Sequence, residues 1–195
     1  MKKITITQIS EKKIKAGNPL LQMEDFPNEL SFDEGELVEL VDSRQKFVAK
    51  AYLAKQNKGV GWVFSLDNAD SFNEAFFKKQ FEKAKRKRTD LQSDPETTTY
   101  RLFNAEGDGI PGVTIDHYDG FAVVSWYSEG IFRYQTAIIA AFQAVFPETK
   151  GIYEKFRYQR KDGLISRYVR GDAAPTPLIV KENGINYATY LDDGL

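Results

Sequence analysis

Carboxylates and a single imidazole gather near the middle of the chain, where they could serve acid–base chemistry. Paired carboxylates can act as a general acid and base or bind a hard cation, and the candidates are Glu106, Asp108, Asp116 and Asp119. The same residue types are common on solvated turns, and Asp119 stands at an expected turn. His117 is the only histidine, so no second imidazole is present to complete a metal or catalytic pair. We interpret these residues as structural and predict no catalytic residue and no metal site.

The glycines that follow Glu106 suggest at first a loop that binds phosphate groups. Gly107, Gly109 and Gly112 lie close together, but a dinucleotide-binding loop follows a strand and opens a helix. Here Pro111 interrupts the glycines, and a strand-like run comes next. We predict a tight turn before a hairpin rather than a cofactor-binding loop.

Basic side chains offer a different chemistry, the binding of RNA phosphates. One group ends an expected helix, and another alternates with Phe156, Tyr158 and Tyr168, a mixture that suits phosphate contact with base stacking. Basic runs are also common on solvated helix faces. The main candidates for RNA contact are Lys85, Arg86, Lys87, Arg88, Arg157, Arg160, Lys161, Arg167 and Arg170, and further basic residues are Lys12, Lys13, Lys15, Arg44 and Lys46.

The composition excludes several classes of site. The 195 residues contain no cysteine, which rules out disulfides, thiolate zinc sites and thiol nucleophiles within them. Basic and acidic residues number 27 and 28, so RNA binding must be local rather than the result of a general positive field. No run approaches the ~20 apolar residues of a membrane-spanning helix, and the first residues lack the apolar core of a signal peptide. We expect a cytoplasmic chain with no membrane partner.

Residues 1–68 show short alternating runs separated by turns, which predicts a small all-β domain. Residues 18–28 and 55–59 contain proline or glycine and are predicted to be loops. The expected strands are 3–6, 36–41, 46–53 and 60–66.

Residues 69–99 are predicted to form one helix and a linker. Ser71 and Glu74 have the spacing of a capping box, and apolar residues recur behind them with helical spacing. The helix is expected over residues 72–88, where its basic end suits the helix macrodipole. Residues 90–99 are predicted to be a polar linker.

Residues 100–190 have the pattern of a second, α+β domain. Asp119-Gly120 separates two alternating runs, and this dipeptide predicts a β-hairpin because both turn positions need positive φ. A helix is expected over 134–145, ended by Pro147, and is followed by a strand at 152–154. Asn183-Gly184 predicts a second hairpin.

The run from Tyr100 to Asp116, YRLFNAEGDGIPGVTID, resembles the central region of a bacterial enzyme family. The family consists of PUA-domain-containing, S-adenosylmethionine-dependent 23S rRNA (cytosine-C5) methyltransferases. The order of the other predicted elements is similar to that family over the full chain.

The resemblance implies an α+β chain with an N-terminal PUA-like β-barrel and a small α+β domain of antiparallel hairpins. It further implies that the Rossmann-like methyltransferase domain is absent, with residues 191–195 as its start. S-adenosylmethionine is expected for the intact protein and no cofactor for this chain, whose partner would be 23S rRNA. Cytosine-C5 methylation needs a thiolate that adds to C6, so a chain without cysteine is expected to be inactive by itself.

Two other functions remain open at this stage. The chain could be a stand-alone RNA-binding module, although its small net charge is unfavourable for that function. It could also be a protein-interaction module, with a homodimer formed through exposed aromatic residues. The aromatic candidates for such an interface are Trp62, Phe64, Trp126 and Tyr127.

Overall fold

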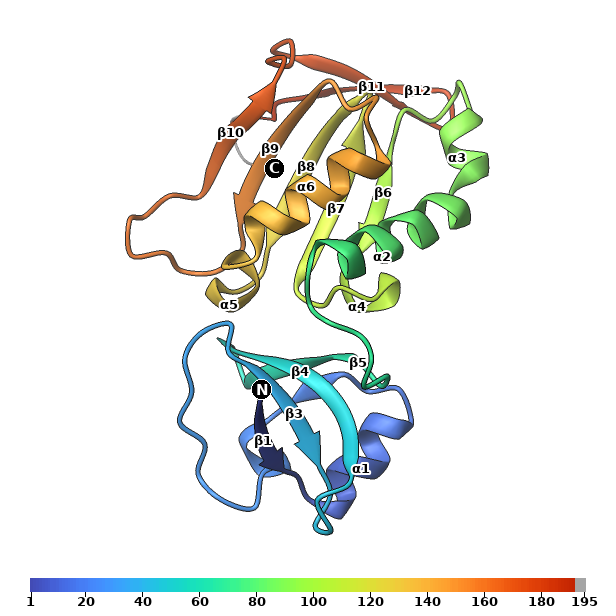
Figure 1. Cartoon of the computed structure of the whole chain (residues 1–195). Coiled ribbons are helices and arrows are strands. Elements are labelled where there is room, and N and C mark those ends of the chain that lie inside the picture. Colours follow the sequence, from blue (N-terminus) through green and yellow to red (C-terminus); the bar gives the residue numbers. More distant parts are fainter. Residues whose placement is uncertain (192–195) are drawn as a thin grey trace.

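The computed structural model describes residues 1–191, which form two domains stacked end to end (Figure 1). The first domain is built on a five-stranded sheet in the order β1-β3-β4-β5-β2. Strand β1 pairs parallel with β3, whereas the other neighbours are antiparallel. The strands are β1 (Lys2–Thr5), β2 (Leu20–Leu21), β3 (Leu37–Val41), β4 (Phe47–Gln56) and β5 (Gly59–Ser65).

The first domain also contains helical segments, so the prediction of an all-β domain is wrong. Helix α1 (Gln8–Lys15) begins after Thr7, whose side chain accepts a hydrogen bond from the backbone N of Ser10. A 3₁₀ turn, η1 (Met23–Asp25), follows β2, and both lie in the segment 18–28 that the sequence predicts to be a loop. Helix α1 lacks an apolar stripe because its buried residues are Ser10 and Ile14, which explains why the periodicity does not reveal it.

The β4–β5 hairpin of the first domain extends further than predicted and reaches toward the second domain. Strand β4 continues to Gln56, and the tip turns at Asn57, whose φ is 52°. One set of hairpin residues, which includes Ala51 and Leu53, packs in the core of the first domain. Tyr52 and Trp62 belong instead to the large core that continues into the second domain. The hairpin therefore joins the two domains and presents its tip at their junction.

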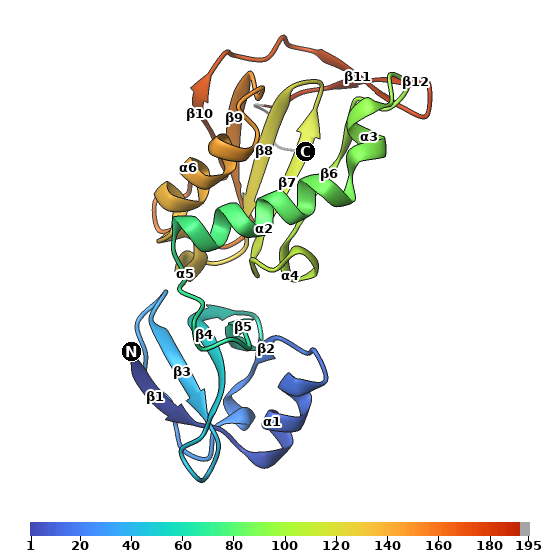
Figure 2. The ribbon, with the colours of Figure 1, turned by 45° about the vertical axis from the view of Figure 1, so that its right-hand side comes forward.

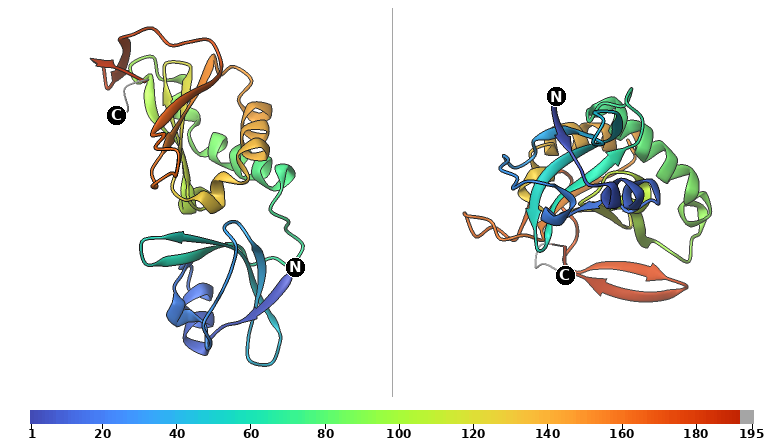
Figure 3. Two further views of the ribbon diagram at one scale, coloured as in Figure 1. Left: turned by 90° about the vertical axis from the view of Figure 1, so that its left-hand side faces the viewer. Right: turned by 90° about the horizontal axis from the view of Figure 1, so that it is seen from below.

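The second domain contains a five-stranded sheet in the order β10-β9-β8-β7-β6. Two helices, α2 and α6, cover one face of this sheet (Figure 2). Strands β11 and β12 form a separate hairpin at the end of the domain that is far from the first domain (Figure 3). The elements are α2 (Glu74–Lys87), α3 (Thr89–Ser93), β6 (Thr99–Asn104), α4 (Ala105–Asp108), β7 (Val113–Tyr118), β8 (Phe121–Trp126), α5 (Glu129–Phe132), α6 (Gln135–Val145), β9 (Gly151–Phe156), β10 (Ser166–Gly171), β11 (Leu178–Glu182) and β12 (Ile185–Thr189).

Helix α2 is present as predicted, but its cap is a different residue. The side chain of Asn73 accepts a hydrogen bond from the backbone N of Phe76 at 3.1 Å, so Ser71 and Glu74 do not form the predicted capping box. The buried face of α2 includes Phe81, whose ring meets that of Phe142 on α6 at 5.7 Å between centroids. Part of the predicted linker is also helical, because α3 lies there.

Both predicted hairpins of the second domain are confirmed. At the β7–β8 turn, Asp119 has φ of 46° and Gly120 has φ of 92°. At the β11–β12 turn, Asn183 and Gly184 have φ of 50° and 79°. Two consecutive positive φ values match the twist of the flanking strands, which is why these dipeptides identify the turns from sequence.

The predicted fold class is wrong. The prediction gave the second domain antiparallel hairpins and left out any Rossmann-like part. Strands β8 and β9 run parallel, in register from Phe121 with Gly151 to Trp126 with Phe156, and α5 and α6 connect them. A strand–helix–strand crossover of this kind is the unit from which Rossmann-like sheets are built. The second sheet is therefore mixed. The sequence of one strand does not show whether its neighbour runs parallel or antiparallel to it. The absence of a glycine-rich loop does not exclude a strand–helix–strand crossover.

The predicted domain boundaries at residues 68, 99 and 190 remain a proposal, which the arrangement of the elements supports. Strands β1–β5 lie before Leu66, and α2 packs on α6 of the second domain. The domains are joined by hydrogen bonds from the Tyr52 hydroxyl to the Pro111 carbonyl at 3.0 Å and from the Tyr134 hydroxyl to the Gly35 carbonyl at 2.6 Å. The methyltransferase-domain start predicted for residues 191–195 falls, apart from Leu191, outside the described residues.

Candidate nucleic-acid interface

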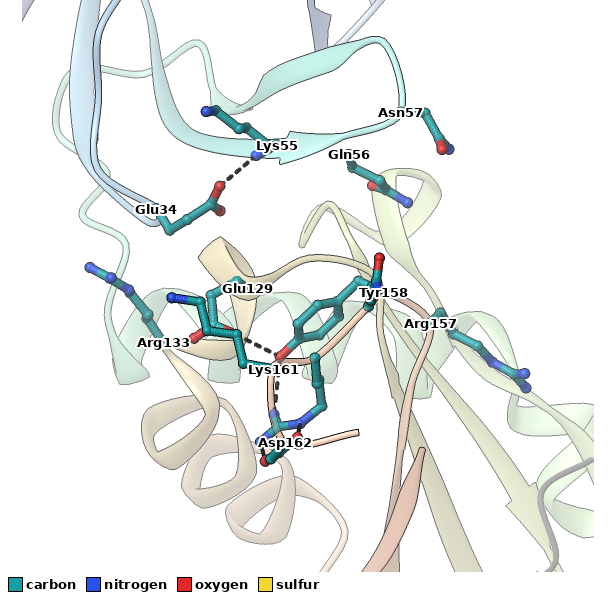
Figure 4. A pocket seen from close by; sticks show the side chains of 12 residues that line it. Glu34, Lys55, Gln56, Asn57, Glu129, Arg133, Arg157, Tyr158, Lys161 and Asp162 are labelled. Atoms are coloured by element: carbon teal, nitrogen blue, oxygen red, sulfur yellow. Dashed lines mark hydrogen bonds and ion pairs between the residues drawn. The ribbon is translucent and has the colours of Figure 1, made fainter. Parts of the chain in front are cut away.

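A cleft of about 710 Å³ lies at the junction of the two domains (Figure 4). The first domain lines it with the tip of the β4–β5 hairpin and with Glu34, which precedes β3. The second domain contributes α5 and the segment that follows β9. The lining residues are Glu34, Lys55, Gln56, Asn57, Glu129, Arg133, Arg157, Tyr158, Gln159, Arg160, Lys161 and Asp162.

The cleft lies beyond the carboxyl ends of the parallel strands β8 and β9. Arg157, the first residue after β9, donates its backbone N–H to the carbonyl of Trp126, the last residue of β8, at 2.7 Å. In open α/β sheets, ligands bind in the crevice outside the carboxyl ends of parallel strands. The position of the cleft therefore matches the place where such a sheet binds its ligand.

Arg160 lines the cleft, and its side chain is held by several contacts. Its guanidinium lies 4.0 Å from the ring centroid of Phe156 and donates to Asp162 at 2.8 Å and to the Tyr158 hydroxyl at 3.2 Å. The hydrogen bond to Asp162 raises the pKa of Arg160, and Arg160 in turn lowers the pKa of Asp162 to about 2. Because its donors and its face are occupied, Arg160 is a positioning residue that holds Tyr158.

Tyr158 presents a neutral ring to the cleft (Figure 4). Its hydroxyl donates to the Glu129 carboxylate at 3.0 Å and accepts from Arg160. Burial and the hydrogen bond to Glu129 raise the pKa of Tyr158 to about 12, so the phenol stays protonated at neutral pH. A fixed aromatic ring beside cations is suited to stacking with an unpaired base.

The charges that face the opening of the cleft are mainly positive. Five cations and three carboxylates line it, a balance of +2. The carboxylates of Glu129 and Asp162 are already bound to Tyr158 and Arg160. Within residues 1–191, the exposed side chains of Arg133 and Lys161 form no ion pair. These cations are available to bind an anion, and phosphate groups of RNA are anions of the required kind.

The predicted RNA-binding residues of the second basic group are only partly brought together. Arg157, Arg160 and Lys161 line the cleft. Arg167 does not line the cleft and donates to the fully buried carboxylate of Glu154 at 2.7 Å. Arg170 donates to the side-chain carbonyl of Gln143 on α6 and does not line the cleft.

The basic end of α2 is bound within the second domain rather than arranged as a free patch. Lys85 donates to the Val145 carbonyl at 2.8 Å, and Lys87 and Arg88 form ion pairs with Asp108 at 3.0 and 2.6 Å. Among the described residues, Arg86 is the member of this group whose side chain is exposed without an ion pair. RNA contact by this group remains a prediction.

Structural positions are occupied by Asp108, Asp116, Asp119 and His117. Asp116 pairs with Arg101, and Asp119 lies in the hairpin turn. The Nε2 atom of His117 accepts from the backbone N of Gly120 at 3.1 Å, and burial lowers the pKa of His117. No group of three or more His, Asp or Glu side chains in the described part of the chain could hold a metal ion.

Several cleft residues escape sequence reasoning. Lys55, Gln56 and Asn57 belong to a segment that the sequence predicts to be a loop, and Arg133 is an isolated cation before α6. The available signal is the two-residue connection Asn57-Lys58 before Gly59, which is typical of a hairpin tip. The position of this tip against the other domain depends on tertiary packing.

Sequence comparisons show which known proteins this chain is similar to. Residues 4–66 match the sequence model of the PUA-like domain family. Over the full chain, identity is 38% to a Bacillus subtilis (strain 168) protein named "Putative ribosomal RNA large subunit methyltransferase YwbD", of which the chain covers 50%. Identity is 32% to the ribosomal RNA large subunit methyltransferase I of Vibrio parahaemolyticus, over 82% of this chain and 41% of that protein.

Solved structures agree with these sequence relationships. "A putative sam-dependent methyltransferase from Streptococcus mutans" superimposes with a TM-score of 0.92 at 41% identity, over 100% of this chain and 50% of its own. A second structure, described as "a putative methyltransferase complexed with SAH", has the same TM-score and identity and is covered to 49%. The chain thus spans about half the length of the relatives it matches. The structural match covers the whole of this chain, and strands β8 and β9 are parallel. Together these findings overturn the prediction that Rossmann-like structure is absent.

The start of α5, the helix that follows β8, does not fit S-adenosylmethionine, although this is where a Rossmann-like sheet would bind a nucleotide. Gly130 is packed so closely that a Cβ there would lie 2.4 Å from the Cβ of Ala54 and 3.0 Å from the backbone N of Gly35. The first domain therefore fills the space in which a cofactor would approach the backbone.

Two remaining predictions concern other partners. The aromatic residues chosen for a homodimer interface are mostly internal, since Trp62, Phe64 and Trp126 are 5%, 8% and 0% exposed. The homodimer prediction relied on these side chains being exposed, and that assumption is wrong. No helix in residues 1–191 is long and apolar enough to cross a membrane.

Proposed function

We propose that the chain is the rRNA-binding part of an S-adenosylmethionine-dependent methyltransferase that acts on 23S rRNA in the cytoplasm. The observation that carries the proposal is the positively charged cleft at the carboxyl ends of β8 and β9. The similarity to proteins named as ribosomal RNA large subunit methyltransferases, over 100% and 82% of this chain, supports the choice of substrate.

The cleft binds RNA through two kinds of contact. Lys55, Arg133 and Lys161 bind backbone phosphates, which gives affinity without sequence preference. Tyr158 stacks on an unpaired base, and Arg160 fixes the ring for that purpose. Hydrogen bonds from Tyr52 to Pro111 and from Tyr134 to Gly35 join the two domains beside the cleft, and such contacts favour a preformed site for RNA.

The intact protein is proposed to form 5-methylcytidine. Cytosine C5 becomes nucleophilic only after a thiolate adds to C6, and these 195 residues contain no cysteine. The contribution of this chain is therefore to bind and position the rRNA, not to transfer the methyl group.

The purified chain is expected to bind single-stranded rRNA fragments but to transfer no methyl group to them. Affinity should fall as salt rises, with a slope in log K against log salt of about −0.7 for each phosphate contacted. Filter binding across a salt series, run beside incubation with methyl-labelled S-adenosylmethionine, measures both quantities. Absence of binding at low salt would refute the RNA-binding role. Labelled methyl groups in the rRNA would refute the proposal that this chain binds rRNA without methylating it.

A further inference from the structure

A second pocket, of about 340 Å³, lies on the other side of the β4–β5 hairpin tip. Gln56 lines both this pocket and the interdomain cleft. The remaining walls come from β6, α4, the turn before β7, β7 itself and the residue that follows β8. The lining residues are Gln56, Arg101, Asn104, Ala105, Glu106, Gly112, Thr114 and Tyr127.

The pocket contains a buried polar group without a partner. Thr114 is 5% exposed, and among residues 1–191 its Oγ1 has no hydrogen-bond partner. Buried hydroxyl groups are nearly always hydrogen-bonded in folded proteins, so each exception needs an explanation. A bound ligand that forms a hydrogen bond with Thr114 Oγ1 would explain why this hydroxyl group has no partner within the protein.

The other polar groups of the pocket suit a nucleobase better than a phosphate. The charge of Arg101 is neutralised by an ion pair with Asp116, and the pocket also contains the carboxylate of Glu106. Arg101 donates to the Asn104 Oδ1 at 3.2 Å, which orients that carboxamide and leaves its nitrogen as a donor. Carboxamides such as those of Asn104 and Gln56 form paired hydrogen bonds with base edges.

An aromatic ring completes the pocket. Tyr127 is half-buried, and its backbone N donates to the Gly112 carbonyl at 3.0 Å, which fixes the residue beside the turn. Aromatic faces stack on unpaired bases irrespective of the base sequence.

We propose that this second pocket binds one unpaired base of the RNA whose backbone lies in the interdomain cleft. Tyr127 stacks on the base, while Thr114, Asn104 and Gln56 form hydrogen bonds with its edge. This assignment rests on the proposed RNA-binding function and adds to it a site that contacts a base directly. The hairpin tip at Gln56 separates the phosphate-binding side from the base-binding side.

The test compares two ligands with the same number of phosphates: a fluorescent nine-nucleotide uridine RNA and an abasic ribose-phosphate nine-mer. Tyr127→Leu is expected to weaken binding of the uridine RNA about tenfold, and Thr114→Val about fivefold. Neither change should alter the affinity for the abasic nine-mer. Thermal unfolding checks the fold, and Thr114→Val should not lower Tm because the hydroxyl it removes has no partner.

The outcomes separate this inference from the proposed function. If the wild-type chain binds the uridine RNA but both variants bind it equally well, the base pocket is refuted and the RNA-binding role stands. If the variants lose affinity for both ligands equally, the two residues have only a structural role and the inference is also refuted. If the wild-type chain binds neither ligand, both proposals fall.

Discussion

Replacing Lys55 and Lys161 together by glutamate is expected to weaken binding of single-stranded RNA by on the order of 10- to 100-fold near physiological salt. Both lysines line the cleft, Lys55 from the first domain and Lys161 from the second. Each substitution removes a phosphate contact and adds repulsion. The slope of log K against log salt should become shallower by about 0.7 for each lost contact. Fluorescence anisotropy at several salt concentrations measures both effects.

The control for this prediction is a matched change of charge away from the cleft. Lys78→Glu alters an exposed lysine of α2 that forms no ion pair within residues 1–191. It should change affinity much less than Lys161→Glu alone. Equal effects of Lys78→Glu and Lys161→Glu would mean that the net charge of the chain, not the cleft, controls RNA binding.

Asp108→Ala is expected to lower the free energy of unfolding by about 3 kcal/mol at neutral pH. The Asp108 carboxylate is buried and accepts from Arg88 at 2.6 Å, from the backbone N of Asn104 at 2.8 Å and from Lys87 at 3.0 Å. Its removal leaves the largely buried guanidinium of Arg88 without its counter-ion. Urea unfolding measures the loss, and Asp90→Ala on the exposed surface of α3 should cost far less.

The effect of Asp108→Ala should depend on pH. Burial alone would raise the pKa of Asp108, but the hydrogen bonds from Arg88, Asn104 and Lys87 outweigh it and lower the pKa. A carboxyl with a lowered folded-state pKa stabilises the protein above its unfolded pKa of about 3.9, and this contribution is lost as pH falls through the folded value. The difference between wild type and Asp108→Ala should therefore narrow in acid. A constant difference down to pH 3 would contradict this role.

Local signals predict the elements that depend on local chemistry. Asp119-Gly120 and Asn183-Gly184 identify their turns because positive φ is a property of the turn residues themselves. Helix α1 is missed because its buried residues are Ser10 and Ile14, too few to form an apolar stripe. The parallel pairing of β8 with β9 is missed because strand direction is decided by the crossover between them.

The candidate site is harder to predict because its parts are distant in sequence. Lys55 and Lys161 come to line one cleft only after the two domains pack together, and no pattern in either segment encodes that arrangement. The basic end of α2 illustrates the same limit. Asp108, the partner of Lys87 and Arg88, reaches them only through the fold. Charge runs in the sequence therefore locate cations but not the anions that neutralise them.

The most direct test of the account is to map where RNA contacts the chain. Photo-crosslinking of the purified chain to a 4-thiouridine nine-mer, followed by mass spectrometry of the peptides, identifies these contacts. Crosslinks are expected in the segment that contains Tyr158, and unlabelled RNA should compete with them. Crosslinks confined to α1 or to the basic end of α2, with none on the cleft, would contradict it.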